Sequence, residues 1–321
     1  MTRPDTILPP EADSIVISVN PKAGSRSSQS RVERLVELLD QQRFQVETFT
    51  DLDRVGERAN QLHDQRRLRA LVAVGGDGTA AELVNRTQDG LPLTLLPSGN
   101  ENLLARYLNI GKSPEDICRT IAAGHLLRID AGKANGRIFL LMIGCGFDAE
   151  VVRRVHSRRT GHIRSRDYFK PILESIRSYR YPELRLSWEE GQSPEESQSP
   201  EKPTAEPLTS EEVVRWLFAF NLPCYGGGMQ FAPQADGTDG LLDFCAFRRG
   251  SLLAGMRYAA AVFLRRHHRL ADCTVARVRR LRITADEEVP YQLDGDPGGV
   301  LPVDVETVPQ RLTMVVPGTG D

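Results

Sequence analysis

The sequence has no uncharged hydrophobic run that approaches the roughly 18 residues of a membrane-spanning helix. Its first residues, MTRPDTILPPEAD, also lack the apolar core of a signal peptide. We therefore expect any contact with a membrane to be peripheral.

Cysteine is scarce, and no CxxC pair occurs. The five cysteines are Cys118, Cys145, Cys224, Cys245 and Cys273. Such wide spacing argues against a disulfide framework or a structural zinc site and is typical of a reducing compartment. We therefore predict buried free thiols and a cytoplasmic protein, with any peripheral contact at the inner face of the membrane.

Neither sign of charge dominates. The net charge is −2 and the isoelectric point is near 6.3, so bulk charge does not indicate a nucleic-acid partner. The six histidines show no metal-ligand spacing. With 321 residues, 40% of them hydrophobic, the chain is long enough for two domains, each with its own core.

The first part of the chain alternates short β-type runs with amphipathic stretches. The predicted strands are Ile15–Val19, Phe44–Phe49, Leu71–Val74 and Leu93–Leu96, and the predicted helices are Arg31–Leu39 and Thr79–Asn85. This alternation predicts an open, parallel α/β sheet over residues 1–129. Ligands of such sheets bind at the carboxyl ends of the strands.

Strand-like runs dominate residues 130–321, which predicts a second, β-rich domain whose extreme C-terminus is free to pack back on the first. The runs are Leu126–Asp130, Phe139–Ile143, Glu183–Trp188, Val213–Asn221, Leu241–Phe247, Val278–Thr284 and Leu312–Val316. Two amphipathic stretches, Tyr168–Tyr179 and Ser251–Arg266, interrupt them. Glu189–Glu212 has too little apolar surface to offset the entropy of ordering, so we predict a disordered insertion there, between two strands.

A glycine-rich turn follows the third predicted strand. The segment LVAVGGDGTAAEL (71–83) runs from a buried strand through Gly75, Gly76, Asp77, Gly78 and Thr79 into a helix. Backbone N–H groups at a helix N-terminus can bind phosphate. Asp77 would repel a bare phosphate, so we expect it beside a cation such as Mg²⁺ or as a hydrogen-bond anchor for the loop. A plain tight turn that caps the helix is the alternative.

No Walker GxxxxGK[ST] loop occurs, so a nucleotide must be bound in another way. Two further polar turns, NPKAG (20–24) and PSGNEN (97–102), end the first and fourth predicted strands. In a parallel sheet both lie at the same edge as the glycine-rich turn. Three such turns together predict a binding site at that edge.

These motifs resemble, in order, the catalytic domain of the diacylglycerol kinase family of lipid kinases, which includes sphingosine and ceramide kinases. The resemblance continues through FLLMIGCGFDAE (139–150), NLPCYGGG (221–228), AP (232–233), DGLLD (239–243) and LDGD (293–296). It spans most of residues 14–318 apart from the acidic insertion. It implies an α/β nucleotide-binding domain followed by a β-sandwich domain, with the active site in the cleft between them. The implied activity is ATP- and Mg²⁺-dependent transfer of phosphate to a lipid hydroxyl in phospholipid metabolism.

The family's roles carry over only where the residues match. The resemblance implies that Gly75, Gly76, Gly78 and Thr79 bind the nucleotide phosphates, together with Asn20, Gly24, Gly99 and Asn102. It implies that Asp77 helps to place Mg²⁺ during catalysis. Asp239 matches a position that in bacterial members helps to hold a structural Mg²⁺.

The last motif of the family usually reads Asp-Gly-Glu, and its acidic third residue is the general base. Here that residue is Asp296, which the resemblance implies accepts the proton of the lipid hydroxyl. Composition alone makes Asp294-Gly295-Asp296 an exposed hairpin turn. Leu103 stands where the family commonly has an acid, and sphingosine-kinase-type members also carry a non-acidic residue there. The acceptor therefore stays open between diacylglycerol and sphingoid types.

Two other functions remain open. NAD kinases resemble this family and share GGDGT, so the acceptor could be soluble. Leu103 and Asp296 also suit a regulator that binds nucleotide or lipid without catalysis.

Two basic clusters are candidates for contact with anionic lipid headgroups. They are Arg153–Lys170 and Arg265–His268, the second of which follows the amphipathic Leu252–Leu264. A solvated helix face is the alternative for each. The expected partner is a lipid presented at a membrane surface, and the oligomeric state stays open, with a dimer compatible.

Overall fold

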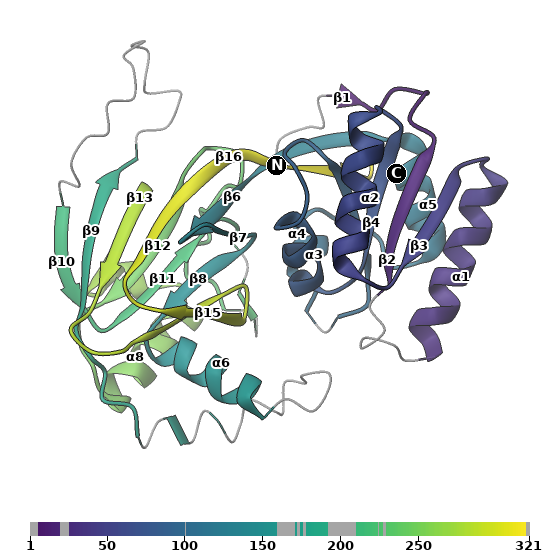
Figure 1. The fold of residues 1–321 in the computed structure, drawn as a ribbon. Coiled ribbons are helices and arrows are strands. Elements are labelled where there is room, and N and C mark those ends of the chain that lie inside the picture. The colour runs from purple at the N-terminus through teal and green to yellow at the C-terminus, as the bar shows by residue number, and fades with distance from the viewer. Residues whose placement is uncertain are drawn as a thin grey trace, which may run out of the picture. The chain divides into compact units, whose positions relative to one another are not determined.

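The computed structural model describes residues 6–19, 26–99, 101–158, 171, 174–175, 178–191, 210–223, 225–226 and 229–318. The chain divides into two compact units. The first comprises Met1–Ile129 and Gln310–Asp321, and the second comprises Asp130–Pro309. Strands β6 (His125–Ala134) and β16 (Val303–Val316) each contribute residues to both units (Figure 1).

The first unit is a parallel sheet with helices on both faces. Its elements are β1 (Thr6–Ile7), β2 (Ser14–Val19), α1 (Arg26–Gln41), β3 (Gln45–Phe49), α2 (Leu52–Asp64), β4 (Leu68–Gly75), α3 (Asp77–Val84), β5 (Pro92–Pro97), α4 (Leu103–Tyr107) and α5 (Pro114–Ala123). The strand order is β3-β2-β4-β5-β16, and these neighbours are parallel. Helix α1 packs on α5, and α2 packs on α3, so each pair covers one face of the sheet (Figure 1).

The hydrophobic pattern of the sequence explains this arrangement. Every residue of β4 is buried, as expected for the central strand of a sheet that is covered on both sides. On α1, Val32, Leu35 and Leu39 repeat at helical spacing and are buried against the sheet. Each strand predicted in residues 1–129 lies within an observed strand or overlaps it.

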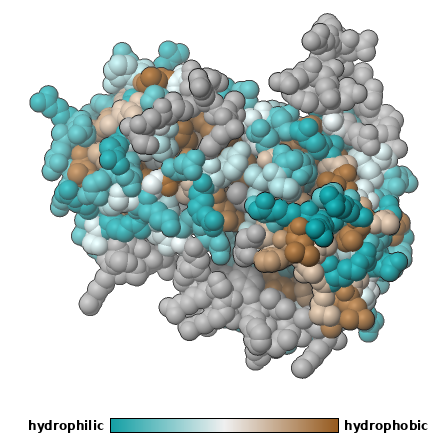
Figure 2. All heavy atoms as spheres, turned by 180° about the vertical axis from the view of Figure 1, so that it is seen from behind, coloured by the Kyte–Doolittle hydropathy of each residue, from teal (hydrophilic) through white to brown (hydrophobic). Residues whose placement is uncertain are grey.

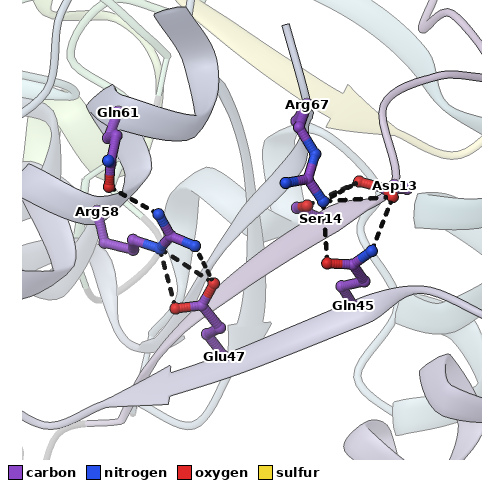
Figure 3. Close-up of polar contacts among 7 residues, drawn as sticks. All are labelled: Asp13, Ser14, Gln45, Glu47, Arg58, Gln61 and Arg67. Atoms are coloured by element: carbon purple, nitrogen blue, oxygen red, sulfur yellow. Dashed lines mark hydrogen bonds and ion pairs between the residues drawn. The ribbon is translucent and has the colours of Figure 1, made fainter. Parts of the chain in front are cut away.

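Polar side chains tie together the amino ends of the strands (Figure 3). Arg67 donates hydrogen bonds to Asp13 at 3.1 Å and to Gln45 at 2.9 Å, which joins the starts of β2, β3 and β4. Arg58 on α2 binds both carboxylate oxygens of Glu47 on β3, and this hydrogen bonding lowers the pKa of Glu47. The opposite edge of the sheet, where the strands end, carries the glycine-rich turns.

The second unit is built mainly of antiparallel strands. Its elements are β7 (Arg137–Phe139), β8 (Met142–Cys145), α6 (Phe147–Ser157), β9 (Leu184–Glu190), β10 (Ser210–Val214), β11 (Trp216–Phe220), β12 (Leu242–Phe247), α8 (Leu252–Phe263), the 3₁₀-helix η4 (His267–Arg269), β13 (Cys273–Thr284), β14 (Pro290–Leu293) and β15 (Asp296–Val300). The order is β15-β14-β8-β11-β12-β13, and β13 also pairs with β9 and β16. Buried aromatic side chains such as Phe139, Trp188 and Phe244 fill its core. The predicted fold class, an α/β domain with a β-sandwich-like second domain, is confirmed.

Several expectations for the second unit need correction or fall outside the described residues. The predicted insertion is too long, because Glu189 and Glu190 end β9 and residues 210–212 begin β10. These two strands pair antiparallel, with Trp188 opposite Ser210, so the insertion does connect two strands. Residues 192–209 and most of Tyr168–Tyr179 lie outside the described residues.

Two further features concern cysteines and membrane spans. The cysteines that the structure describes, Cys118, Cys145, Cys245 and Cys273, are all free thiols. Within the described ranges, no helix combines the length and apolar character needed to cross a bilayer.

A two-residue hairpin turn joins β14 to β15. Asp294 and Gly295 have φ values of 54° and 86°, as a type I′ turn requires. The Asp294 carboxylate folds back and accepts hydrogen bonds from the backbone N–H groups of Leu140, Leu141 and Met142 at 2.7, 2.8 and 3.0 Å. This aspartate therefore fixes the hairpin against the start of β8.

We predict that Asp294→Asn lowers the free energy of unfolding by about 2 kcal/mol, because an amide offers one acceptor oxygen to three N–H groups. Denaturant titration of the purified chain measures this. The matched control is Asp304→Asn, whose exposed carboxylate faces Arg282 at 3.2 Å and should change stability by less than about 1 kcal/mol. Equal stability of the two variants would contradict the anchoring role of Asp294.

Candidate functional site

The glycine-rich turn after β4 packs backbone to backbone against the turn after β5. A Cβ on Gly75 would lie 2.3 Å from the Thr79 hydroxyl, and one on Gly99 would lie 2.8 Å from the Gly76 Cα. The Ser98 N–H donates to the Gly75 carbonyl at 2.9 Å. The two turns thus need glycine where they touch.

Asp77 is the first residue of α3, and its carboxylate points to the second turn. Its two oxygens accept hydrogen bonds from the N–H groups of Leu103 and Leu104 at 2.9 and 3.0 Å, at the start of α4. Burial raises the pKa of Asp77, and these hydrogen bonds oppose the rise. Of the two roles expected for Asp77, the loop anchor is thus visible directly.

Asn102 closes the second turn. Its side-chain oxygen accepts from the Gly99 N–H at 3.0 Å, and its amide donates to the Gly99 carbonyl at 2.8 Å. It precedes α4 with a left-handed backbone, φ 48°. Leu103 contributes its backbone N–H to Asp77, a contact that does not depend on an acidic side chain at that position.

The structure therefore brings together Gly75, Gly76, Asp77, Gly78, Thr79, Gly99 and Asn102. Gly76 is the N-cap of α3, so the turn presents the N-terminus of a helix, a place that favours an anion. Asn20 and Gly24 lie outside the described residues.

The second unit carries the predicted base. Asp296 opens β15, and its side chain is 33% exposed, so it can still meet a substrate. Its Oδ1 lies 2.9 Å from Nε2 of His156, on α6. The other ring nitrogen, Nδ1, lies 3.2 Å from the Val152 carbonyl. Because a carbonyl can only accept, Nδ1 carries a proton and Nε2 faces the carboxylate.

A partly buried chain of polar groups, with Gln292 fully buried at its centre, supports this hairpin. The Gly295 N–H donates to Gln292 at 2.7 Å, and the Gln292 amide donates to Asp148 at 3.0 Å. The Tyr225 hydroxyl also donates to Asp148, at 2.7 Å. Burial raises the pKa of Asp148. Helix α6 thus holds the turn at two points, through Asp148 at its start and His156 at its end.

Sequence reasoning missed this support. Asp148 lies in the family-like motif FLLMIGCGFDAE, and Gln292 directly precedes LDGD, but neither motif indicates that these two side chains meet. His156 lies in the basic stretch Arg153–Lys170, whose composition indicates contact with lipid headgroups or a solvated helix face and not the support of a base. No local pattern links His156 to Asp296, because the two residues meet only when α6 packs on β15.

Asp239, the other predicted metal ligand, has a guanidinium partner. Its carboxylate forms an ion pair with Arg277 and accepts from the Leu241 N–H at 3.0 Å. The neighbouring Asp243 is buried, which raises its pKa to about 6. Among the described residues, no three His, Cys, Asp or Glu side chains are grouped as metal ligands. As arranged here, Asp239 does not fit a metal cage, and its metal role stays a prediction.

Comparisons with known proteins match both units. Residues 14–134 match the model of the diacylglycerol kinase catalytic domain, and residues 142–316 match that of the YegS C-terminal NAD kinase beta sandwich-like domain. The chain is 25% identical over 310 residues to a diacylglycerol kinase of Bacillus subtilis, with 94% of this chain and 95% of the relative covered.

Two further similar proteins are also named diacylglycerol kinases. A diacylglycerol kinase of Mycobacterium tuberculosis is 27% identical over 277 residues, with 80% of this chain and 83% of the relative covered. The crystal structure of a diacylglycerol kinase from Bacillus anthracis superposes with a TM-score of 0.64 at 17% identity, over 95% of this chain and 97% of that one. That structural match supports the fold alone. The matched domain models span most of the sequence, and the chain belongs to the diacylglycerol kinase catalytic-domain family.

Proposed function

We propose that this chain transfers the γ-phosphate of ATP to the hydroxyl of a lipid of the diacylglycerol or sphingoid type. The observation that carries the proposal is Asp296. In a member of a kinase family, this carboxylate is partly exposed, stands at the position of the family's base, and is held from two sides by α6.

In the proposed reaction, Asp296 accepts the proton of the lipid hydroxyl. The hydroxyl oxygen then bonds to the γ-phosphorus, while the bond from that phosphorus to the β–γ bridging oxygen breaks and ADP leaves. Phosphoryl transfer needs positioning and charge neutralisation more than covalent help from the protein. A single well-held carboxylate is sufficient for the proton.

His156 supports that base. Its Nε2 lies 2.9 Å from one oxygen of the Asp296 carboxylate, which places the edge of the imidazole ring directly against the base. It also orients the carboxylate, since His156 is itself fixed by its contact with the Val152 carbonyl. His156 is therefore a positioning residue, and Asp296 is the group that meets the substrate.

The glycine-rich turn is the proposed nucleotide site. The N-terminus of α3 and the close-packed glycines would bind the phosphates, together with Asn20 and Gly24. Asp77 fits a role beside Mg²⁺, because the start of α4 donates one hydrogen bond to each of its oxygens and such metal sites use one or two carboxylates with the phosphates. Bound Mg²⁺ would supply neutralisation of phosphate charge.

We predict that Asp296→Asn lowers kcat by about 100-fold or more, because an amide cannot accept the proton. Asp296→Glu, which restores the usual residue of the family, should retain most activity. The measurement is transfer of labelled phosphate from ATP to diacylglycerol, ceramide, sphingosine, monoacylglycerol and phosphatidylglycerol in mixed micelles, with NAD as a soluble acceptor. Full activity of Asp296→Asn would show that Asp296 is not the general base. Transfer to NAD and to no lipid would overturn the proposed acceptor class.

We predict that Asp77→Ala raises the KM for ATP with Mg²⁺ by about tenfold or more. It should also lower the free energy of unfolding by about 1–2 kcal/mol, because the N–H groups of Leu103 and Leu104 lose their acceptor. The control is Asp40→Ala on the exposed side of α1, expected within about 0.5 kcal/mol of the wild type. An unchanged KM would exclude Asp77 from the nucleotide site.

We predict that His156→Gln lowers kcat by about tenfold and leaves both KM values unchanged, because binding is intact and only the base is less well held. Replacement of His63 by Gln is the control. If His156→Gln alters stability alone, the positioning role is wrong.

A further inference from the structure

Helix α8 turns an apolar face to solvent. Its buried side chains, Ala254, Tyr258 and Val262, recur every four residues and pack inward. The opposite side carries large hydrophobic residues that are exposed by 41% at Leu252, 74% at Leu253, 55% at Met256, 76% at Phe263 and 61% at Leu264. These five residues are the α8 patch.

The α8 patch is concentrated. Eight large hydrophobic residues are exposed in the part of the chain that the structure describes, and five of them belong to this patch. In Figure 2, the view from behind, hydrophobic side chains gather at the lower right, on the side where α8 lies after the half-turn from Figure 1. Scattered exposed hydrophobic residues are ordinary, whereas a contiguous group indicates a binding surface.

The surroundings of the patch are exclusively basic along the chain. Residues 248–271, RRGSLLAGMRYAAAVFLRRHHRLA, contain no Asp or Glu. Arg265, Arg266 and Arg269 follow the helix and are exposed, and none has an ion-pair partner among the residues described. The sequence cluster Arg265–His268 is thus a free basic edge, although His267 itself is buried and bonds to the Phe231 carbonyl.

The other basic candidate is different. In the described part of Arg153–Lys170, Arg153 and Arg154 both bind the buried Glu150, and Arg158 pairs with Glu174. These three arginines already have acidic partners within the protein. They offer less to an external anion than the arginines beside α8.

The helix is held firmly from below. Asp272 accepts hydrogen bonds from Arg257 at 2.6 Å and from the Tyr258 hydroxyl at 2.7 Å. The Tyr258 ring stacks on Phe247 with 4.2 Å between ring centroids. The apolar face is therefore a fixed surface, since its buried side already has its partners.

We propose that α8 and the arginines after it form a docking surface for an anionic lipid bilayer, with Leu253, Met256 and Phe263 inserted at the level of the headgroups. A helix that lies in the interface combines an apolar face with flanking basic residues, as this one does. Anionic headgroups supply the charge that Arg265, Arg266 and Arg269 lack within the protein. A second copy of the chain offers poorer charge complementarity, because its own residues 248–271 carry the same arginines and no carboxylate to pair with them.

This inference deepens the proposed function, since it names the surface that would present the lipid acceptor. It rests on that function for its purpose, but the binding can be measured without catalysis. The test measures sedimentation of the full chain with phosphatidylcholine vesicles that contain either no anionic lipid or roughly 30% phosphatidylglycerol. The anionic lipid is included because it attracts basic segments.

The wild type should bind the anionic vesicles and lose affinity as salt is raised. We expect the double variant Leu253→Gln/Phe263→Gln to bind about tenfold more weakly or worse, as should Arg265→Gln/Arg266→Gln/Arg269→Gln, which should also flatten the salt dependence. The matched control is Ile7→Gln/Val213→Gln, which changes exposed hydrophobic residues elsewhere and should bind as the wild type does. Thermal unfolding checks that each variant is folded.

A second reading comes from Leu253→Trp, whose fluorescence should shift to shorter wavelength on anionic vesicles. Absence of wild-type binding, or equal binding by all variants, would overturn the docking surface. So would a change from dimer to monomer in Leu253→Gln/Phe263→Gln without any change in vesicle binding, because the face would then join two copies.

The two proposals fail separately. Phosphate transfer to lipid in detergent micelles without vesicle binding overturns the α8 surface and leaves the lipid kinase. Vesicle binding that depends on the α8 patch, without transfer to any lipid, confirms the surface and overturns the kinase.

Discussion

The position of the proposed base depends on one carboxylate that is not itself the base. Asp294 accepts hydrogen bonds from three successive backbone N–H groups at the start of β8, and this holds the turn between β14 and β15 in its left-handed conformation. Asp296 follows directly and can point only where the turn allows. Gln292 and Asp148 then connect the turn to α6, which also carries His156. The partly exposed carboxylate is thus oriented by a hydrogen-bonded network that includes the buried Gln292, as a preorganised site requires.

The first unit uses the same device. Both carboxylate oxygens of Asp77 accept hydrogen bonds from the N–H groups that begin α4. Gly75, Gly76 and Gly99 let the two turns approach each other without a Cβ between them. Burial of such a carboxylate favours its neutral form, and the N–H groups compensate by stabilising the charge. In each unit, an acidic residue within a motif, Asp294 or Asp77, fixes a turn by accepting backbone hydrogen bonds. Any role of Asp77 beside a nucleotide is added to that task.

Helix α8 shows the opposite use of side chains. Tyr258, Arg257 and Asp272 satisfy one another beneath the helix, while its outer side leaves apolar area in water. Leaving that area exposed forgoes hydrophobic stabilisation unless another surface covers it. The basic edge of Arg265, Arg266 and Arg269 identifies the charge that such a surface would carry. The side chains beneath α8 therefore have their partners within the second unit, whereas the outer side of α8 leaves its apolar area uncovered.

Sequence periodicity alone determined the parallel strands, α3 and the glycine-rich turn, because buried runs such as Leu71–Val74 and glycines at a strand end are local signals. The motif order determined the family. It could not show β14 and β15, whose short segments PYQL and DPGGV contain proline and glycine and resemble loops. Nor could it show that Asp77 caps α4, that Arg277 pairs with Asp239, or that His156 meets Asp296. Those contacts join residues that are distant along the chain, and only the packing of elements decides which side chains come within hydrogen-bonding reach.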